Sequence, residues 1–337
     1  MAKSSSWTDT IGMTSLPPNT TLAILGSVKL GHVLPCLGVA HALGIKPEIR
    51  PVKPGPLFHL VSPWGPADPR DNALDPPYPD IVLASGRETA PYLRAIRKRS
   101  GGKTFTVFLG NPRNWRRRFH LICLPEHDRL SGRNVFTTLT APHPRDARAR
   151  EEARANPHPA IAVLPSPRVA LLIGGPSRKY SFEHTDIEAL ATIAAQILES
   201  GASLMVSPSR RTPQELINRI RLIVEANEDW KHRTFLWDGS GENPYMTMLA
   251  MADYFVVTTD SVNMIGESIA TGKPVHVYEP TGHAQKFGHF INELLTQGTI
   301  RPWAGHIENW TYKPIDSTPL IAREIAQRFA EFRRTQT

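Results

Sequence analysis

The sequence predicts an α/β protein with two Rossmann-like domains in tandem, and three observations lead to this fold class. Short apolar segments alternate with helical segments from residue 21 onward, a pattern typical of parallel sheets. A charged and then proline-rich stretch interrupts the alternation at residues 151–167. The chain has 337 residues, which is enough for two domains. Because such sheets bind ligands beyond the carboxyl ends of their strands, we expect the site in an interdomain cleft.

The first domain is expected over residues 21–150, after a flexible Ser/Thr-rich tail of residues 1–20. Its helices are predicted at 33–43, closed by Gly44, and at 87–99, closed by Gly101. Its strands are predicted at 21–26, 48–53, 80–84, 103–109, 120–124 and 134–139. Residues 151–167, with four prolines, form the predicted linker.

The second domain is expected over residues 168–317, followed by an amphipathic helix within residues 318–337 that packs back on the N-terminal domain. Its strands are predicted at 168–173, 203–206, 234–236, 254–257 and 274–278. Its helices are predicted at 185–200, 212–225, 244–252, 261–270 and 289–297.

Charge is divided unevenly along the chain. Residues 1–167 hold 22 Lys and Arg against 12 Asp and Glu, whereas residues 168–337 hold 17 against 19. A basic front half could meet an anionic membrane surface, a phosphorylated lipid or a nucleic acid, or it could be an ordinary solvated surface. No helix-turn-helix or RNA-binding signature is present, so no nucleic acid is expected.

Cysteine spacing and hydropathy indicate which redox compartment the protein suits and whether it spans a membrane. Cys36 and Cys123 are far apart and form no CxxC pair, which argues against a disulfide framework or a zinc site and favours a reducing compartment. No apolar run reaches the roughly 18 residues that a membrane span requires.

The helix start after the strand at 254–257 is the most informative stretch. Asp260, Ser261 and Asn263 open this helix, where free backbone N–H groups and a partial positive charge suit a phosphate. Glu267 lies one turn after Asn263 on the same face, where its carboxylate could accept hydrogen bonds from two ribose hydroxyls. The combination predicts a nucleotide or nucleotide-sugar site.

Loops after three other strands of the second domain supply further candidates. Glycines in a loop after a domain's first strand let the backbone approach a phosphate, and two guanidiniums at a strand end can hold a diphosphate. A tryptophan in such a loop either stacks on a base or simply packs. The residues are Gly174, Gly175 and Ser177, then Arg210 and Arg211, then Trp237.

The front domain offers candidates for acid–base chemistry and for binding an acceptor. Its first turn is not GxGxxG, so a dinucleotide fingerprint is not supported. His32 follows this turn as a candidate base or ligand for an acceptor, and His127 and Asp128 end a later strand. The candidate acceptor-binding residues are Lys29, Gly31 and Arg87 of this domain, together with Lys286, which follows the last predicted strand of the second domain.

Taken together, these elements resemble the plant mitochondrial-fission Elm-type proteins and their bacterial homologues. The segments that carry the resemblance are Gly31-His32, Pro125-Glu126-His127-Asp128, Leu139-Thr140-Ala141-Pro142-His143, Gly174-Gly175-Pro176-Ser177, Ser209-Arg210-Arg211-Thr212-Pro213, Thr259-Asp260-Ser261-Val262-Asn263-Met264, Thr271-Gly272-Lys273-Pro274-Val275 and Lys286-Phe287. They run through most of the chain after residue 20.

The layout is also similar to GT-B glycosyltransferases, including the enzyme that adds N-acetylglucosamine to the lipid-linked peptidoglycan precursor. This resemblance implies that Gly174, Gly175, Ser177 and Ser261 meet the donor's phosphates and that Glu267 meets its ribose. It also implies that the front domain binds the acceptor, often at a membrane surface. The first turn, residues 26–32, departs from the glycine-richer loop of those enzymes.

The leading hypothesis is a metal-independent, GT-B-like glycosyltransferase of the bacterial cell envelope. It would use a nucleotide-sugar donor, no cofactor and an anionic lipid-linked or glycolipid acceptor, with His32, or else Asp128 or His127, as base. We expect it in the cytoplasm, peripheral on the inner membrane. The alternatives are a nucleotide-sugar epimerase, which needs no acceptor, and a non-enzymatic adaptor of the kind that the plant relatives suggest. Nicotinamide redox chemistry is disfavoured by the missing fingerprint.

Overall fold

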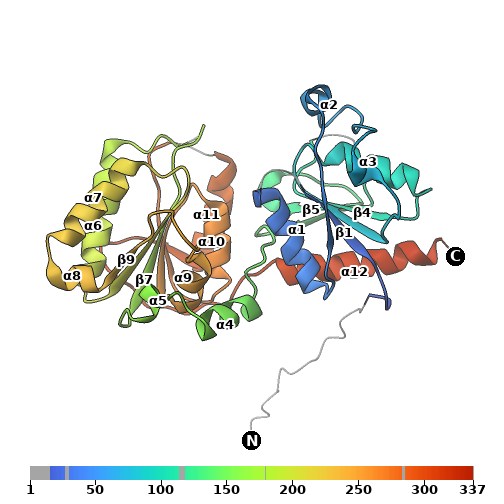
Figure 1. Ribbon diagram of the computed structural model, residues 1–337. Helices are drawn as coiled ribbons and strands as arrows, with labels where there is room; N and C mark the ends of the chain where they lie inside the picture. The colour runs from blue at the N-terminus through green and yellow to red at the C-terminus, as the bar shows by residue number, and fades with distance from the viewer. Residues whose placement is uncertain (1–15, 27–29, 114–117, 179, 283–284, 337) are drawn as a thin grey trace, which may run out of the picture. The chain divides into compact units, whose positions relative to one another are not determined.

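The computed structural model describes residues 16–26, 30–113, 118–178, 180–282 and 285–336. The chain forms two compact units (Figure 1). Unit 1 comprises residues 1–138, 142–144 and 317–337, and unit 2 comprises residues 139–141 and 145–316. Each is an α/β unit built on a parallel sheet of six strands, so the predicted fold class of two Rossmann-like domains is confirmed.

The sheet of unit 1 has the strand order β2-β1-β3-β4-β5-β6, and its strands pair in parallel throughout. The strands are β1 (Leu22–Gly26), β2 (Glu48–Pro51), β3 (Ile81–Ala84), β4 (Phe105–Leu109), β5 (Leu121–Pro125) and β6 (Val135–Thr138). The chain first moves from β1 to β2 on one side and then to β3 on the other. The side on which new strands are added therefore reverses between β1 and β3. Open α/β sheets bind their ligands at such a reversal point.

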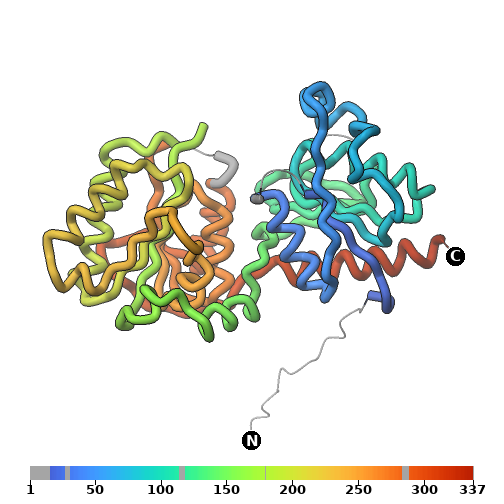
Figure 2. The backbone as a smooth tube through the Cα atoms, in the orientation of Figure 1, coloured from blue at the N-terminus to red at the C-terminus, as the bar shows by residue number. Residues whose placement is uncertain are grey.

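Helices cover both faces of this sheet because successive strand residues point to opposite faces. Leu22 and Ile24 pack on one face against α1 (Leu30–Ala42) and α12 (Thr318–Arg334), and Ala23 and Leu25 pack on the other against α3 (Ala90–Arg99). Figure 2 shows the C-terminal helix beside the first helix of the same unit, although the two are far apart in sequence. The short helices of unit 1 are α2 (Pro56–Val61), η1 (Asn72–Leu74) and η3 (Glu126–Asp128).

The sheet of unit 2 has the strand order β12-β11-β10-β7-β8-β9. The strands are β7 (Arg168–Ile173), β8 (Ser203–Pro208), β9 (Thr234–Leu236), β10 (Tyr254–Thr258), β11 (Val275–Tyr278) and β12 (Ile300–Pro302). Numbered along the unit, this is the Rossmann order 3-2-1-4-5-6, whose reversal point lies between β7 and β10. The sequence did not predict β12, a three-residue edge strand that ends in a proline.

Helices again lie on both faces of the second sheet. The cluster on one face includes residues of α6 (His184–Glu199) and α7 (Gln214–Glu225), with α8 (Glu228–His232) beside α7. The other face is covered by α5 (Pro159–Ala162), α9 (Tyr245–Met251), α10 (Val262–Ile269) and α11 (Gln285–Thr296), and α4 (Ala147–Ala155) packs on α9. No described helix is both long enough and apolar enough to cross a membrane.

Residues 151–167, which we expected to be a linker, instead form most of α4 and all of α5 and belong to unit 2. Asp146 caps α4 by accepting a hydrogen bond from the Ala149 N–H, and Pro159 occupies the first turn of α5, where a proline starts a helix rather than breaking it. Ile161 and Leu164 are buried in the core of unit 2. In this stretch a proline therefore begins the helix α5, and the residues do not form a flexible linker.

Candidate functional site

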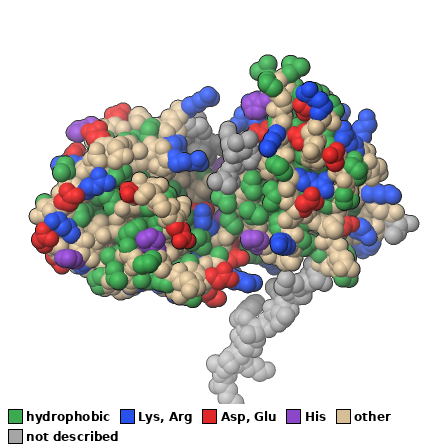
Figure 3. Space-filling model, in the orientation of Figure 1, with side chains coloured by type: hydrophobic (Ala, Val, Ile, Leu, Met, Phe, Trp, Pro, Cys, Tyr) green, Lys and Arg blue, Asp and Glu red, His purple; other side chains and the backbone are tan. Residues whose placement is uncertain are grey.

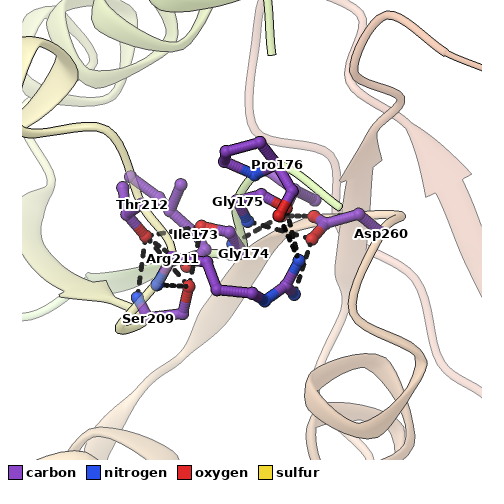
Figure 4. Close-up of polar contacts among 9 residues, drawn as sticks. Ile173, Gly174, Gly175, Pro176, Ser209, Arg211, Thr212 and Asp260 are labelled. Carbon is purple, nitrogen blue, oxygen red and sulfur yellow. Dashed lines mark hydrogen bonds and ion pairs between the residues drawn. The ribbon is translucent and has the colours of Figure 1, made fainter. Parts of the chain in front are cut away.

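The loop that follows β7 lies at the reversal point of the second sheet, and its backbone is held by residues at the end of β10 and just after it. The Gly174 N–H donates to Thr258 Oγ1 at 2.8 Å, and the Gly175 N–H donates to Asp260 Oδ2 at 2.9 Å. Figure 4 shows this loop against Asp260 on one side and the chain after β8 on the other. The predicted glycine loop and the predicted helix start are thus neighbours in the fold.

Both glycines are required by their surroundings. A Cβ on Gly174 would lie 2.1 Å from Asp260 Oδ2, and one on Gly175 would lie 2.2 Å from the carbonyl oxygen of Arg211. Real Cβ atoms do not approach other atoms so closely, and the obstacle at Gly175 is backbone that cannot rotate away. The loop therefore keeps its shape only with glycine at both positions.

Asp260 holds the β7 loop in place through hydrogen bonds to Gly175 and Arg211. Its side chain is fully buried, although Arg211 beside it is about half exposed. Asp260 Oδ1 accepts from the Thr258 hydroxyl at 2.7 Å, and Oδ2 also accepts from Arg211 Nη2 at 3.0 Å. Sequence analysis assigned Asp260 to donor binding. Its burial makes it a positioning residue for Gly175 and Arg211, because no side-chain oxygen faces solvent.

Arg211 closes the loop from the side of β8. Its Nη1 donates to the carbonyl oxygens of Gly175 and Pro176, the latter at 3.0 Å. The Ser209 hydroxyl donates to the Gly174 carbonyl at 2.9 Å, and Thr212 Oγ1 accepts from the Ser209 N–H at 2.8 Å. Arg210 and Arg211 are both exposed, but the hydrogen bonds to the described part of the loop come from Arg211.

The start of α10 lies beside the same loop. Ser261 occupies the cap position without a side-chain capping bond, and the first N–H groups of a helix have no partner within the helix. Ser261 is half-buried, whereas Asn263 in the first turn and Ser177 at the end of the β7 loop are exposed.

Glu267, one turn further along α10, is held by two side chains. Its Oε1 accepts from Arg145 Nε at 3.0 Å, and its Oε2 accepts from the Tyr245 hydroxyl at 2.6 Å. The Arg145 guanidinium also lies over the Tyr245 ring, 4.7 Å from its centroid. Burial, and then the nearby Glu267 charge, raise the pKa of Tyr245 well above its usual value, so its hydroxyl stays a donor.

Trp237 lies after β9, beyond β8 from the glycine loop. Its indole N–H donates to the Ser240 carbonyl at 3.0 Å, and its ring packs partly against the core of unit 2. The structure thus shows Trp237 partly packed on the core, and the ring is half-buried.

In unit 1, His32 occupies the reversal point between β1 and β3. Its ring packs on Gly86, where an added Cβ would lie 2.3 Å from His32 Nδ1, and Gly86 has a φ of +93° that favours glycine. Glu88 Oε1 lies 3.9 Å from the same Nδ1, and its side chain is only 11% exposed.

The other residues predicted for acid–base chemistry or acceptor binding do not lie together. Arg87 is exposed and donates to the His59 carbonyl at 3.2 Å, and Gly31 is exposed at the start of α1. His127 and Asp128 lie in η3 after β5, two strands from β3, so they are not grouped with His32. Lys29 lies outside the described residues, as does the side chain of Lys286 in α11. Among the residues that are described, no three His, Cys, Asp or Glu side chains could hold a metal ion together.

Four residues that build these sites were not among the predicted site residues. Thr258 had a usable signal, since it is a hydroxyl residue at the end of the strand beside the reversal point. Arg145 and Tyr245 had none, because they reach Glu267 from 122 and 22 residues away in sequence. Glu88 lies in the segment 85–89 that follows β3, and the pairing of β1 with β3 brings this segment beside His32.

The comparisons with known proteins agree with this description. The family model for mitochondrial fission ELM1 matches residues 30–329. The mitochondrial fission protein ELM1 of Arabidopsis thaliana is 29% identical over 278 residues, which cover 75% of this chain and 64% of that protein. An uncharacterized protein of Rickettsia prowazekii is 31% identical over 165 residues, covering 46% of this chain and 45% of that protein. The match thus spans less than two thirds of either relative.

Solved structures share the fold. The UDP-GlcNAc 2-epimerase of Methanocaldococcus jannaschii, solved in complex with UDP-GlcNAc and UDP, superposes with a TM-score of 0.52. The two chains are 11% identical, and the alignment covers 92% of this chain and 99% of the epimerase. The expected GT-B-like fold is thereby supported, as is the Elm-type resemblance. Because its family model covers most of the sequence, this chain belongs to the mitochondrial fission ELM1 family.

Proposed function

We propose that unit 2 binds a nucleotide sugar and that its diphosphate lies on the β7 loop and the start of α10. The observation that carries the proposal is the Gly174–Gly175 backbone, braced by Asp260 and Arg211 at the reversal point of a Rossmann sheet. The Gly174 and Gly175 N–H groups already donate to Thr258 and Asp260, so the first N–H groups of α10 and the exposed Arg210 would meet the phosphate charge. The epimerase with the same fold was solved with UDP-GlcNAc and UDP, which supports this ligand class.

Glu267 would bind the ribose. A carboxylate has about four lone-pair sites, so Glu267 can accept ribose hydroxyls in addition to its bonds from Arg145 and Tyr245. Those two partners fix the carboxylate before the ligand arrives, which reduces the entropy lost on binding. The side chain is 13% exposed, enough to present an oxygen edge to a ligand.

The reaction that we propose is transfer of the sugar to an acceptor hydroxyl. His32 would take the hydroxyl proton as the acceptor oxygen bonds to the anomeric carbon and the bond to the diphosphate breaks. Glu88 would stabilise the imidazolium that forms. The first N–H groups of α10 and the Arg210 guanidinium would stabilise the leaving diphosphate as its charge grows. His32 is preferred to His127 or Asp128 because it lies at the reversal point of its sheet.

An epimerase is the second candidate, favoured by the fold shared with the UDP-GlcNAc 2-epimerase. It acts on the nucleotide sugar alone, whereas a transferase turns over only with an acceptor. Incubating the protein with a nucleotide sugar and no acceptor, and following the sugar by NMR, separates the two. A new epimer in the absence of acceptor would replace the transferase proposal.

The first experiment is a thermal-shift screen against UDP, GDP, ADP, CMP, TDP and their sugars. A ligand that binds only the folded state raises the melting temperature. We expect a shift with one nucleotide family, which is lost in Glu267→Ala and kept in Glu199→Ala, an exposed carboxylate on α6. If a well-folded sample shows no shift with any of these ligands, the proposal is wrong and an adaptor role, as the relatives' name suggests, becomes the better hypothesis.

A further inference from the structure

Unit 1 carries a cluster of exposed apolar side chains on and around α2. Leu57 is 67% exposed, Leu60 75% and Trp64 61%. Of the eight large hydrophobic residues that are exposed in the described part of the chain, five fall between residues 49 and 64; Ile49 and Val61 complete the set. We call Leu57, Leu60, Val61 and Trp64 the α2 tip.

The spacing of the α2 tip is that of one helix face. Residues 57, 60 and 61 stand at i, i+3 and i+4, the pattern that normally turns a helix toward a core. Here no residue of α2 is buried, so the apolar face is turned to solvent. Figure 3 shows hydrophobic side chains gathered at this end of unit 1, with Lys and Arg side chains around them. The face lacks a partner among the residues that the structure describes.

Hydrogen bonds connect the α2 tip to the rest of unit 1. The Gly65 N–H donates to the Val61 carbonyl at 2.9 Å, and a Cβ on Gly65 would lie 2.3 Å from Val61 Cγ2, so the chain turns tightly back at a glycine. The Ser62 hydroxyl donates to the Arg87 carbonyl at 2.7 Å. Residue 87 follows Gly86, on which His32 packs, so the α2 tip is tied to the loop beside the candidate base.

Arg94 joins the α2 tip to a basic groove. Its Nη1 donates to the Pro63 carbonyl at 2.9 Å and its Nη2 to the Gly65 carbonyl at 2.7 Å, on either side of Trp64. The same side chain lines a groove of about 510 Å³ whose other residues are Arg97, Lys98, Gly102 and Arg118. Burial, and then repulsion from Arg118, lower the pKa of Arg94 to about 10. No acidic side chain lines the groove, so an anion is the ligand that it fits.

We propose that the α2 tip inserts into an anionic lipid bilayer and that the basic groove holds lipid phosphates at its surface. Apolar side chains with a tryptophan, next to a band of cations, match the two layers of a membrane interface: acyl chains and anionic headgroups. Unit 1 as a whole has 22 Lys and Arg against 11 Asp and Glu, which adds attraction to an anionic surface. A tip of four side chains is too small for a stable protein interface, which buries about 800 Å² per partner.

Docking of this kind would bring the bilayer to the loop that carries Gly86, next to His32. An acceptor hydroxyl on a membrane lipid would then be presented at the candidate base. This consequence rests on the proposed function, whereas the docking surface itself stands on unit 1 alone.

The test is vesicle flotation of the full chain. We expect the wild type to float with phosphatidylcholine vesicles that contain about a third phosphatidylglycerol, and to float less with phosphatidylcholine alone. The Leu57→Ser/Leu60→Ser/Trp64→Ser variant should partition at least about ten-fold less, because the apolar area that enters the acyl layer is lost. Arg97→Glu/Lys98→Glu should weaken binding to the anionic vesicles only. Leu222→Ser, at a leucine 61% exposed on α7 of unit 2, is the matched control and should float as the wild type does.

Insertion is separated from surface adsorption by lipids brominated in their acyl chains. Such lipids should quench part of the tryptophan fluorescence of the wild type, and Trp64→Leu should remove that quenching while the protein still floats. Failure of the wild type to float, or flotation of the triple-serine variant at the wild-type level, would overturn the docking proposal. Nucleotide-induced thermal shift, measured on the same variants, tests the donor site of unit 2 without involving the membrane. The docking proposal and the nucleotide-sugar proposal can therefore fail independently.

Discussion

Single residues fix the geometry of the β7 loop, and the clearest case is Gly175. We predict that Gly175→Ala lowers the free energy of unfolding by about 1–3 kcal/mol, because the new Cβ must displace the backbone of Arg211. It should also abolish the thermal shift with nucleotides. Urea unfolding and the ligand screen measure the two effects. Gly288→Ala, where an added Cβ meets nothing within 4 Å, should show neither loss. A Gly175→Ala protein that binds nucleotides normally would remove the loop from the site.

The hydroxyl of Tyr245 is the second prediction at this scale. Tyr245→Phe removes the 2.6 Å hydrogen bond to Glu267 but keeps the ring under Arg145. We expect nucleotide affinity to fall by about 3–10-fold, equivalent to one net hydrogen bond, with the fold intact. Isothermal titration calorimetry measures the change, and Tyr254→Phe in β10 of the same unit serves as the control. An unchanged dissociation constant would show that the Tyr245 hydroxyl does not prepare Glu267 for the ligand.

At the scale of elements, α12 is attached to the first sheet partly through a histidine. His120 stacks on Phe105 of β4 at 5.3 Å between ring centroids and contacts Phe332 of α12 at 4.7 Å. Its Nδ1 accepts from the Thr106 N–H at 3.0 Å. Burial, and then the Arg97 charge, lower the pKa of His120 to about 4.

This shift predicts acid sensitivity with a definite sign. The unfolded chain binds the His120 proton near pH 6.5, before the folded chain does, so stability falls as pH falls from about 6.5 toward 4. We expect His120 to contribute roughly 1–2 kcal/mol of this loss after solvent screening. Urea unfolding between pH 7.5 and pH 4.5 measures it. His120→Asn, which keeps an acceptor near Thr106, should flatten the profile in part, since burial also lowers the pKa of His276 to about 4. An identical slope in the variant would contradict the prediction.

Elements were the part of the molecule that the sequence predicted best. All six strands of unit 1 and five of the six in unit 2 follow from apolar runs bounded by turn residues. The exceptions have physical causes: β12 is too short to show a period, and the prolines of 157–167 start α5 rather than break the chain. Side chains at strand ends could be named in advance, but their roles could not. Asp260 was expected to bind a ligand, and only the fold reveals that its oxygens face inward.

At the scale of the whole molecule, the chain passes from unit 1 to unit 2 and then returns. Ile321, Ile325 and Phe329 of α12 are buried in the core of unit 1, together with both cysteines. We predict that a chain ending at Asp316 exposes Cys36 and Cys123 to a thiol reagent under native conditions. In the full chain burial raises the pKa of both thiols and keeps them unreactive.

Nucleotide-induced thermal shift of the shortened chain reports on unit 2, whose residues are all retained, and should persist. Slow thiol labelling at the full-length rate would show that unit 1 keeps its core closed without α12, and would contradict the prediction.

The return of the chain to its first unit also sets an order of events on the ribosome. Every strand of unit 2 has been synthesised before α12 begins at Thr318. The face of the first sheet that α12 covers is synthesised much earlier, from β1 onward, and is left without α12 until then. The later half of the protein can therefore finish folding before the earlier half. During that interval the nascent chain presents an apolar face to solvent, and chaperones that recognise such faces would meet unit 1 rather than unit 2.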